Sequence, residues 1–139
     1  MTPPVLVVMG VSGAGKTTLA KRLAARFGWT FQEGDALHPP ANIAKMKAGH
    51  PLNDADRAPW LAAIGRWIDA RAAAGEPAVV ACSALKRAYR DTLARGRPQV
   101  RFVFIRLDEA TIAERLAHRR GHFMPPSLLA SQFDALEPP

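Results

Sequence analysis

The sequence predicts an α/β fold of three layers, in which helices cover both faces of a parallel β-sheet. Two observations carry this prediction. Short apolar runs, such as Val5–Met9 and Ala78–Cys82, alternate with longer segments of helical periodicity. The runs stay apolar instead of alternating with polar residues, which is typical of strands buried on both faces. We expect the doubly wound strand order 2-3-1-4-5. Because the 139 residues contain no repeats or linkers, we expect a single domain over 1–139.

The individual elements follow from apolar spacing and from residues that begin or end helices. The expected strands are Val5–Met9, Trp29–Glu33, Ala78–Cys82 and Val100–Leu107. The expected helices are Thr17–Phe27, Pro39–Ala48, Pro59–Ala74, Leu85–Ala94, Glu109–Arg120 and Ser127–Leu136. Gly28 and Gly49 are placed to end the first two helices, and Pro39 and Pro40 suit a first helical turn.

Composition and charge restrict the class of protein. No stretch approaches the ~18 consecutive apolar residues of a membrane span. The N-terminus lacks the pattern of a signal peptide, and the single cysteine, Cys82, suits a reducing compartment, so we expect a cytoplasmic protein without a membrane partner. The net charge of +7 indicates anionic partners. Its basic residues are dispersed and not interleaved with aromatics, which favours small anionic ligands over nucleic acid.

A glycine-rich loop follows the first expected strand. Residues 10–17, GVSGAGKT, match G-x-x-x-x-G-K-[ST] in full, between an expected strand and an expected helix. Such a loop curls so that successive backbone N–H groups surround a phosphate. The predicted nucleotide-binding residues are Gly10, Ser12, Gly13, Ala14, Gly15, Lys16, Thr17 and Thr18. Lys16 would reach the β- and γ-phosphates and the Thr17 hydroxyl would hold Mg²⁺. The alternative is a glycine turn with a solvent-facing lysine.

Motifs that are missing from the sequence exclude several classes of nucleoside-triphosphate-binding protein. The sequence contains no N-K-x-D for guanine and no L-S-G-G-Q-like transporter signature. The chain is also too short for a motor or helicase core. What remains is a small P-loop kinase that binds its acceptor in the same domain.

Two carboxylates at the end of the second strand indicate where the acceptor would bind. Ligands of parallel sheets bind beyond the carboxyl ends of the strands, so Asp35 should face the phosphate loop. We expect Asp35 to orient an acceptor hydroxyl and take its proton, as a catalytic residue together with Lys16. Its alternative role is to cap the following helix. Glu33 points the same way and is a weaker candidate for the metal, through water. His38 follows in the same loop as an expected acceptor contact.

Two further segments carry polar side chains suited to an anionic acceptor. In the loop 49–61, Arg57 can hold a carboxylate with parallel hydrogen bonds. Asp54 and Asp56 would hold Arg57 or, more in keeping with their position, cap the long helix. The segment 82–91, CSALKRAYRD, places Lys86, Tyr89 and Arg90 on one helical turn as acceptor contacts. A solvated helix face with Tyr89 half-buried is an equally good interpretation of the last group.

Taken together, these segments resemble the small P-loop gluconokinases. The resemblance rests on the phosphate loop and on GDALHP, AGHPLNDADRAPW, CSALKRAYRD and RRGHFMPPSLLASQFDALEPP, in this order over nearly the whole chain. It implies a shikimate-kinase-like core, phosphorylation of D-gluconate to 6-phosphogluconate with ATP and Mg²⁺, and a cytoplasmic homodimer. Glu33 departs from the aspartate of many relatives, which leaves its metal role open. Alternatives are another small-metabolite kinase, for shikimate or a nucleotide, and a nucleotide-binding module without turnover.

The segment 115–126 resembles the lid of adenylate-kinase-like enzymes. By that resemblance, Arg115 would lie against the adenine and Arg119 would neutralise the transferring phosphoryl group, as a catalytic and nucleotide-binding residue. His118 and His122 are four residues apart, but Gly121 lies between them and no third ligand is near, so zinc is not expected.

The end of the sequence carries a last expectation. The strand Val100–Leu107 is apolar on both faces, as an interior strand is, and would need a fifth strand beside it. After Leu136 only Glu-Pro-Pro follows, whereas members of the resembled family continue with a strand and a helix. We therefore expect a C-terminally shortened form or an incomplete record.

Overall fold

The computed structural model describes residues 2–11, 14–107, 110–111, 114 and 129–139. Four strands form one parallel sheet with the order β2-β3-β1-β4. They are β1 (Val5–Met9), β2 (Thr30–Glu33), β3 (Ala78–Ala81) and β4 (Val100–Phe104). This confirms the expected order of the first four strands. Within the described ranges there is no fifth strand, and the expectation of one stays a prediction.

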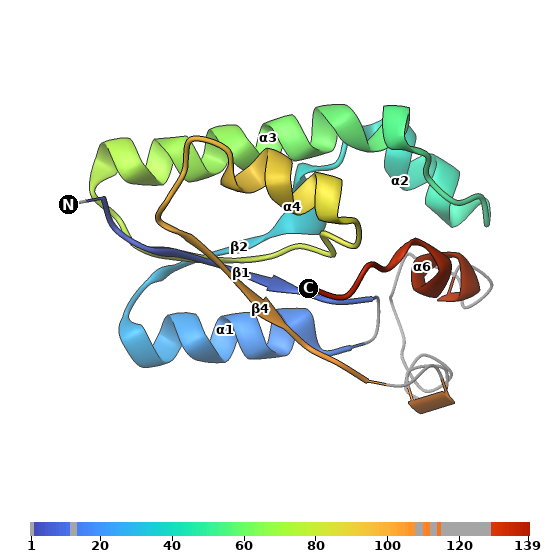
Figure 1. Cartoon of the computed structure of the whole chain (residues 1–139), viewed down its shortest axis with the longest axis horizontal. Helices are drawn as coiled ribbons and strands as arrows, with labels where there is room; N and C mark the ends of the chain where they lie inside the picture. The colour runs from blue at the N-terminus through green and yellow to red at the C-terminus, as the bar shows by residue number, and fades with distance from the viewer. Residues whose placement is uncertain (1, 12–13, 108–109, 112–113, 115–128) are drawn as a thin grey trace.

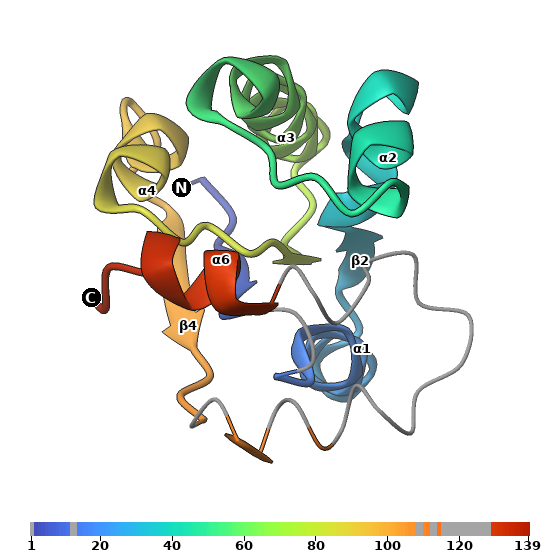
Figure 2. The ribbon, with the colours of Figure 1, turned by 90° about the vertical axis from the view of Figure 1, so that its right-hand side faces the viewer.

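Helices cover both faces of the sheet, as the sequence predicts (Figure 1). Helix α1 (Lys16–Phe27) packs on one face, and α3 (Asp54–Ala74) and α4 (Arg87–Ala94) pack on the other. The short helix η1 (Gly34–Leu37) leads from β2 into α2 (Pro40–Lys47). Helix α6 (Leu129–Ala135) lies in front of the carboxyl ends of the strands, between α4 and α1 (Figure 2). The segments that follow β2 and β3 therefore lie together at the carboxyl ends of the strands.

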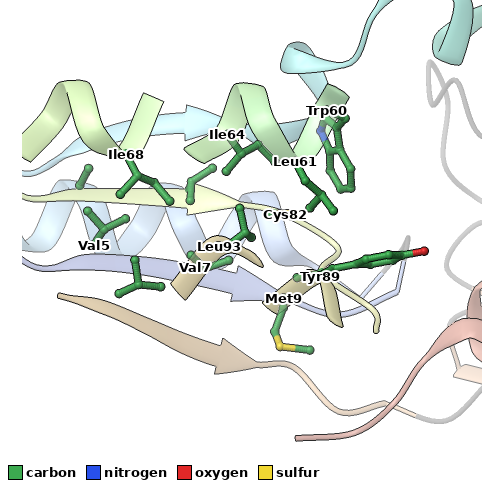
Figure 3. Packing of buried hydrophobic residues seen from close by; sticks show 14 residues of the cluster. Val5, Val7, Met9, Trp60, Leu61, Ile64, Ile68, Cys82, Tyr89 and Leu93 are labelled. Carbon is green, nitrogen blue, oxygen red and sulfur yellow. The ribbon is translucent and has the colours of Figure 1, made fainter. Parts of the chain in front are cut away.

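The larger part of the core lies between the sheet and helices α3 and α4. Val5 and Val7 of β1 pack there against Ile64 and Ile68 of α3 and Leu93 of α4. Each of these side chains is fully buried, which stabilises the fold by about 1.5–3 kcal/mol per side chain. Trp60 and Tyr89 belong to the same cluster but lie at the end toward which the strands point (Figure 3). The core thus continues directly into the region where ligands of such sheets bind.

Helix α3 begins at Asp54, five residues before the Pro59 expected from the sequence. The reason is a capping box. The Asn53 side chain accepts a hydrogen bond from the Asp56 backbone N–H at 2.8 Å, and the Asp56 side chain accepts one from the Asn53 N–H at 2.9 Å. Asp56 thus fulfils the capping role expected of it, whereas Asp54 lies in the first turn and bonds elsewhere. The helix tolerates Pro59 in its interior.

The remaining boundaries differ by a few residues from those expected. Helix α4 begins at Arg87 and strand β4 ends at Phe104, so both are shorter than the sequence suggests. Ala110, Thr111 and Glu114 are helical, and the rest of the expected helix 109–120 lies outside the described residues. The expected lid, 115–126, also lies outside them. None of the described helices is both long and apolar enough to span a membrane.

Candidate active site

The phosphate-binding loop connects β1 to α1. Gly10 and Gly15 have φ angles of 149° and 94°, which side chains rarely allow, and a Cβ on Gly10 would lie 3.0 Å from the Ile105 carbonyl oxygen. The Ala14 N–H donates to the Val11 carbonyl at 3.2 Å, so the backbone turns back on itself. Ser12 and Gly13 lie outside the described residues. The described glycines thus have the conformation that the motif requires.

Lys16 and Thr17 connect this loop to the end of β2. The Lys16 Nζ donates to the Val11 carbonyl at 3.0 Å, which holds the ammonium group across the loop. The Thr17 hydroxyl donates to the Glu33 carboxylate, whose other oxygen accepts from the Asp35 N–H at 3.5 Å. The hydroxyl and the carboxylate expected to serve the metal are therefore in direct contact. Thr18 is exposed in the first turn of α1.

One pocket brings the phosphate loop together with the expected acceptor residues. It has about 360 Å³ of empty space, part of which is open solvent. Its lining residues are Lys16, Asp35, His38, Met46, Leu52, Arg57, Trp60, Ser83 and Gln132. Asp35 does not cap α2, whose N-cap residue is Pro39. The structure thus places Lys16, Asp35, His38 and Arg57 around one space, as the sequence predicts.

His38 is a neutral member of this pocket. Its ring stacks on Trp60 with the centroids 4.2 Å apart, and burial, together with the nearby Arg57 charge, lowers the pKa of His38 to about 4. The Asn42 amide nitrogen lies 3.1 Å from His38 Nδ1 and donates to the Asp56 carbonyl at 2.8 Å. Because that nitrogen is a donor, Nδ1 accepts, and Nε2 carries the proton of the neutral ring. His38 can therefore donate a hydrogen bond without carrying charge.

Arg57 is held by a chain of side chains from α3 and α4. Its Nη1 donates to the Tyr89 hydroxyl at 3.0 Å, and that hydroxyl donates to the Asp54 carboxylate. Lys86 Nζ binds the same carboxylate oxygen at 3.0 Å. The hydrogen bonds from Tyr89 and Lys86 lower the pKa of Asp54. The network fixes the direction of the Arg57 guanidinium, and Arg57 and Lys86 also line an adjoining hollow.

Three of the expected acceptor residues, Lys86, Tyr89 and Arg90, are not among the residues that line this pocket, and Arg90 is tied up elsewhere. It is only 6 % exposed, and its guanidinium donates to the carbonyls of Ala84 at 2.9 Å, Leu85 at 3.1 Å and Glu137 at 2.6 Å. These bonds tie α4 to the segment after α6 and give Arg90 a structural connection, and its expected acceptor contact stays a prediction. The expected lid arginines, Arg115 and Arg119, and the histidines His118 and His122 lie outside the described residues.

Two polar residues of the pocket, Ser83 and Gln132, were not singled out from the sequence. Ser83 comes directly after β3, and the rule that placed Asp35 at a strand end could have found it. Gln132 lies on α6, far along the chain, and enters the pocket only through tertiary packing. No local signal in the sequence distinguishes this glutamine from a surface residue.

Among the described residues, the side chains beside the phosphate loop offer oxygen atoms to a metal ion. In the part of the chain that the structure describes, no group of three or more His, Cys, Asp or Glu side chains gathers around one point. The Thr17 hydroxyl and the Glu33 carboxylate are oxygen donors beside the phosphate loop. Mg²⁺ takes one or two protein oxygens and completes its shell with phosphates and water, so these residues fit that ion.

The phosphate loop, the 2-3-1-4 strand order and the pocket beside Lys16 define a P-loop kinase fold. A family model described as an AAA domain matches residues 5–139. The chain is 57 % identical to a gluconokinase of Gluconobacter oxydans, over all of this chain and 78 % of that protein. It is 46 % identical to the thermosensitive gluconokinase of Escherichia coli, over 96 % of this chain and 71 % of that protein. The chain belongs to the gluconokinase family.

Solved structures agree with this assignment. A gluconokinase from Sinorhizobium meliloti superimposes with a TM-score of 0.87 at 55 % identity, covering 99 % of this chain and 77 % of that one. A sugar kinase from Janibacter, solved without ligand, gives a TM-score of 0.93 at 51 % identity over 98 % of this chain and 79 % of that one.

Proposed function

We propose that this protein transfers the γ-phosphoryl group of ATP to D-gluconate and forms 6-phospho-D-gluconate and ADP. The observation that carries this proposal is the single pocket that Lys16, Asp35 and Arg57 line together. A phosphate-binding cation, a carboxylate and a second cation around one space are what a phosphoryl transfer to an anionic polyol requires. The names of the relatives, gluconokinases in several organisms, support the choice of acceptor.

The residues divide the work of the reaction. The 6-hydroxyl oxygen forms a bond to the γ-phosphorus, the bond from that phosphorus to the β–γ bridging oxygen breaks, and ADP leaves. Asp35 accepts the hydroxyl proton. Arg57, held by Tyr89, binds the gluconate carboxylate with charged hydrogen bonds. His38 donates from its neutral ring to an acceptor oxygen.

The nucleotide is held by the loop that begins at Gly10. The backbone N–H groups of Gly10, Ser12, Gly13, Ala14 and Gly15 would surround the phosphates. Thr18 would add a polar contact at the start of α1. Lys16 neutralises charge at the β- and γ-phosphates. Thr17 would hold Mg²⁺ directly, and Glu33 would hold it through water. When bound, the ion would offset the charge of the phosphates. The proposed roles of Arg115 and Arg119 in covering the nucleotide rest on the family resemblance.

Further properties stay predictions from the sequence and the resemblance. These are a homodimer, a cytoplasmic location, Lys86, Tyr89 and Arg90 as direct acceptor contacts, and the lack of a nucleic-acid partner. For Tyr89 and Arg90 the bonds described above favour indirect roles, in which they position Arg57 and α6.

An acceptor panel tests the proposed function. The purified protein is incubated with ATP and Mg²⁺ and with gluconate, shikimate or AMP, and ADP release is recorded. We expect turnover with gluconate alone, and a product whose phosphorus resonance couples to the C6 protons. Turnover with shikimate or AMP would instead indicate another small-metabolite kinase. Nucleotide binding without turnover on any acceptor would indicate a binding module.

A further inference from the structure

Helix α6 contributes one polar side chain, Gln132, to the lining of the pocket. Gln132 is 7 % exposed and lines the pocket with Lys16, Asp35 and Arg57. Figure 2 shows α6 in front of the strand ends. The Gln132 side chain ends in a carboxamide, which is a polar group among the polar side chains of this pocket. Its oxygen accepts and its nitrogen donates, which matches a hydroxyl group that does both.

Helix α6 is held in position by packing against the phosphate loop and against the segment that precedes α4. Phe133 and Leu136 pack against Val11, Ala14 and Leu85 in one apolar cluster. The described part of α6 has seven residues, too few to be stable without tertiary contacts. The orientation of Gln132 is therefore set by what holds the helix in place.

A set of hydrogen bonds at Glu137, here called the Glu137 clamp, holds the end of this helix. The Glu137 N–H donates to the Leu85 carbonyl at 2.8 Å, and its carboxylate accepts from the Arg87 N–H at 2.8 Å. The buried Arg90 guanidinium donates to the Glu137 carbonyl at 2.6 Å. The N-cap residue of α4, Lys86, provides no side-chain cap. Glu137 therefore caps α4 from a distant part of the chain and fixes α6 to it.

We propose that Gln132 binds hydroxyl groups of the acceptor and that the Glu137 clamp, with Arg90, positions it. The proposal rests on the proposed function for the identity of the acceptor. Gln132 is a specificity-determining residue for the polyol part of gluconate, complementary to Arg57 at the carboxylate. Arg90 and Glu137 are positioning residues, which act on the acceptor through α6.

The first experiment measures steady-state kinetics of Gln132→Leu and Gln132→Glu. Both variants lose the amide donor, so we expect the KM for gluconate to rise about tenfold, as for the loss of one or two hydrogen bonds, with the KM for ATP within about twofold of the original. Gln99→Leu is the matched control, because Gln99 precedes β4 at the far end of the sheet. An unchanged KM for gluconate in Gln132→Leu would overturn the proposal.

Monodeoxy analogues of gluconate distinguish a direct contact from a general loosening of the pocket. If Gln132 binds a hydroxyl, the analogue that lacks this group should bind equally well to the original protein and to Gln132→Leu. A Gln132→Leu defect of the same size on every analogue would show that the side chain does not touch the polyol.

The second experiment tests the Glu137 clamp. Glu137→Ala should raise the KM for gluconate, and Glu137→Gln, which keeps an oxygen for the Arg87 N–H, should restore most of it. The double variant Gln132→Leu/Glu137→Ala should be no worse than the more affected single variant, since both act through one contact. Asp91→Ala, an exposed carboxylate on α4, serves as the control. Independent, additive effects would show that Glu137 only stabilises the fold.

The two proposals fail in different ways. If the unsubstituted protein phosphorylates gluconate and the Gln132 variants retain its KM, the proposed function stands and this inference is wrong. If the unsubstituted protein uses another acceptor, the proposed function is wrong, and the same variants measured on that acceptor decide the role of α6. If no acceptor binds in calorimetry, both proposals are wrong.

Discussion

Neighbouring side chains set the charge and the direction of the polar residues in the acceptor pocket. Asn42 fixes the tautomer of His38, Trp60 stacks on its ring, and Tyr89 orients Arg57. Such support holds a polar group in place before the ligand arrives, so less entropy is lost on binding. Predictions at this scale concern a proton acceptor, a carboxylate contact and a neutral imidazole.

Asp35→Asn should retain ATP affinity and lose turnover. The substitution removes the proton acceptor and leaves the phosphate loop unchanged, so kcat should fall by about 10²–10⁴-fold. Nucleotide binding is measured by calorimetry and turnover by ADP release. A kcat near that of the unsubstituted protein would show that Asp35 is not the base.

Arg57→Lys should weaken gluconate binding by about 1–3 kcal/mol, because lysine cannot form parallel hydrogen bonds to a carboxylate. It should also lose the bond to the Tyr89 hydroxyl that orients the group. Calorimetric titration with gluconate and with ATP checks this. Equal losses for the two ligands would assign Arg57 a structural role.

The lowered pKa of His38 predicts that the fold loses stability as the pH falls. The pKa decreases from 6.5 to about 4 on folding, so between these values the unfolded chain binds a proton that the folded protein does not. Stability is complete above pH 6.5 and should decrease by about 2 kcal/mol between pH 7 and pH 5. Urea unfolding at each pH measures the slope.

Two histidine variants serve as controls for this slope. His38→Gln should flatten it, whereas His50→Gln, at an exposed position, should leave it unchanged. An equal slope in all three proteins would mean that His38 is not the group that titrates.

Much of this pocket could be predicted from single residues, because strand ends and a glycine-rich motif are local signals. They led to Lys16 and Asp35, while the polar loop 49–61 led to Arg57, and the structure places all three side chains around one pocket. The surroundings of Arg90 could not be predicted from such local signals. Its helical spacing from Lys86 suggested a shared pocket edge, but its surroundings are set by Glu137, which only the folded chain brings to it.

At the scale of elements, the turn from β2 into η1 packs very closely against β3, and this contact helps to position the site. A Cβ on Gly34 would lie 2.2 Å from the Ala81 carbonyl oxygen of β3. The Gly34 carbonyl accepts a hydrogen bond from Trp60 Nε1 at 2.9 Å, so the turn is also tied to α3. The sequence showed a glycine before Asp35 but not this requirement, because the crowding comes from a strand far along the chain. The start of α3 was also predicted wrongly. Pro59 suggested the first turn of the helix, but the capping box at Asn53 begins the helix at Asp54.

Gly34→Ala should destabilise the protein by about 3 kcal/mol, since the new methyl group meets rigid backbone on β3. Gly75→Ala is the matched control. At Gly75 φ is 69° and no atom lies within 4 Å of the added Cβ, so only conformational strain of about 1 kcal/mol is expected. Chemical denaturation compares the two variants. Similar losses would show that β2 and β3 separate easily at this point.

At the scale of the whole molecule, the sheet buries its one cysteine completely. Cys82 is 0 % exposed just after β3, and burial raises the pKa of its thiol to about 12. The layered arrangement and strand order could be predicted from the sequence because uninterrupted apolar strands fit few architectures. The placement of α6 could not, since it depends on contacts with Val11 and Leu85.

Thiol labelling should therefore report unfolding of the sheet. In the native protein, Cys82 should react negligibly with an aromatic disulfide reagent, because the thiolate is scarce and the sulfur is inaccessible. In increasing urea the labelling should follow the loss of helical circular dichroism. Rapid labelling without denaturant would show that the carboxyl ends of the strands open locally.

The central place of β1 in the sheet has a consequence for how the chain is made. Val5 pairs with Ala78 on one side and with Val100 on the other, so β1 leaves the ribosome well before either of its neighbours. At a synthesis rate of about 5–20 residues per second, β1 waits roughly 5–20 seconds for β4 to be translated. Both edges of this strand, VLVVM, are unpaired until β3 is made, and the edge that pairs with β4 stays unpaired until the end of the interval. The strand that leads into the phosphate loop of the finished protein is thus an unpaired apolar strand during synthesis, a state that favours pairing with other chains.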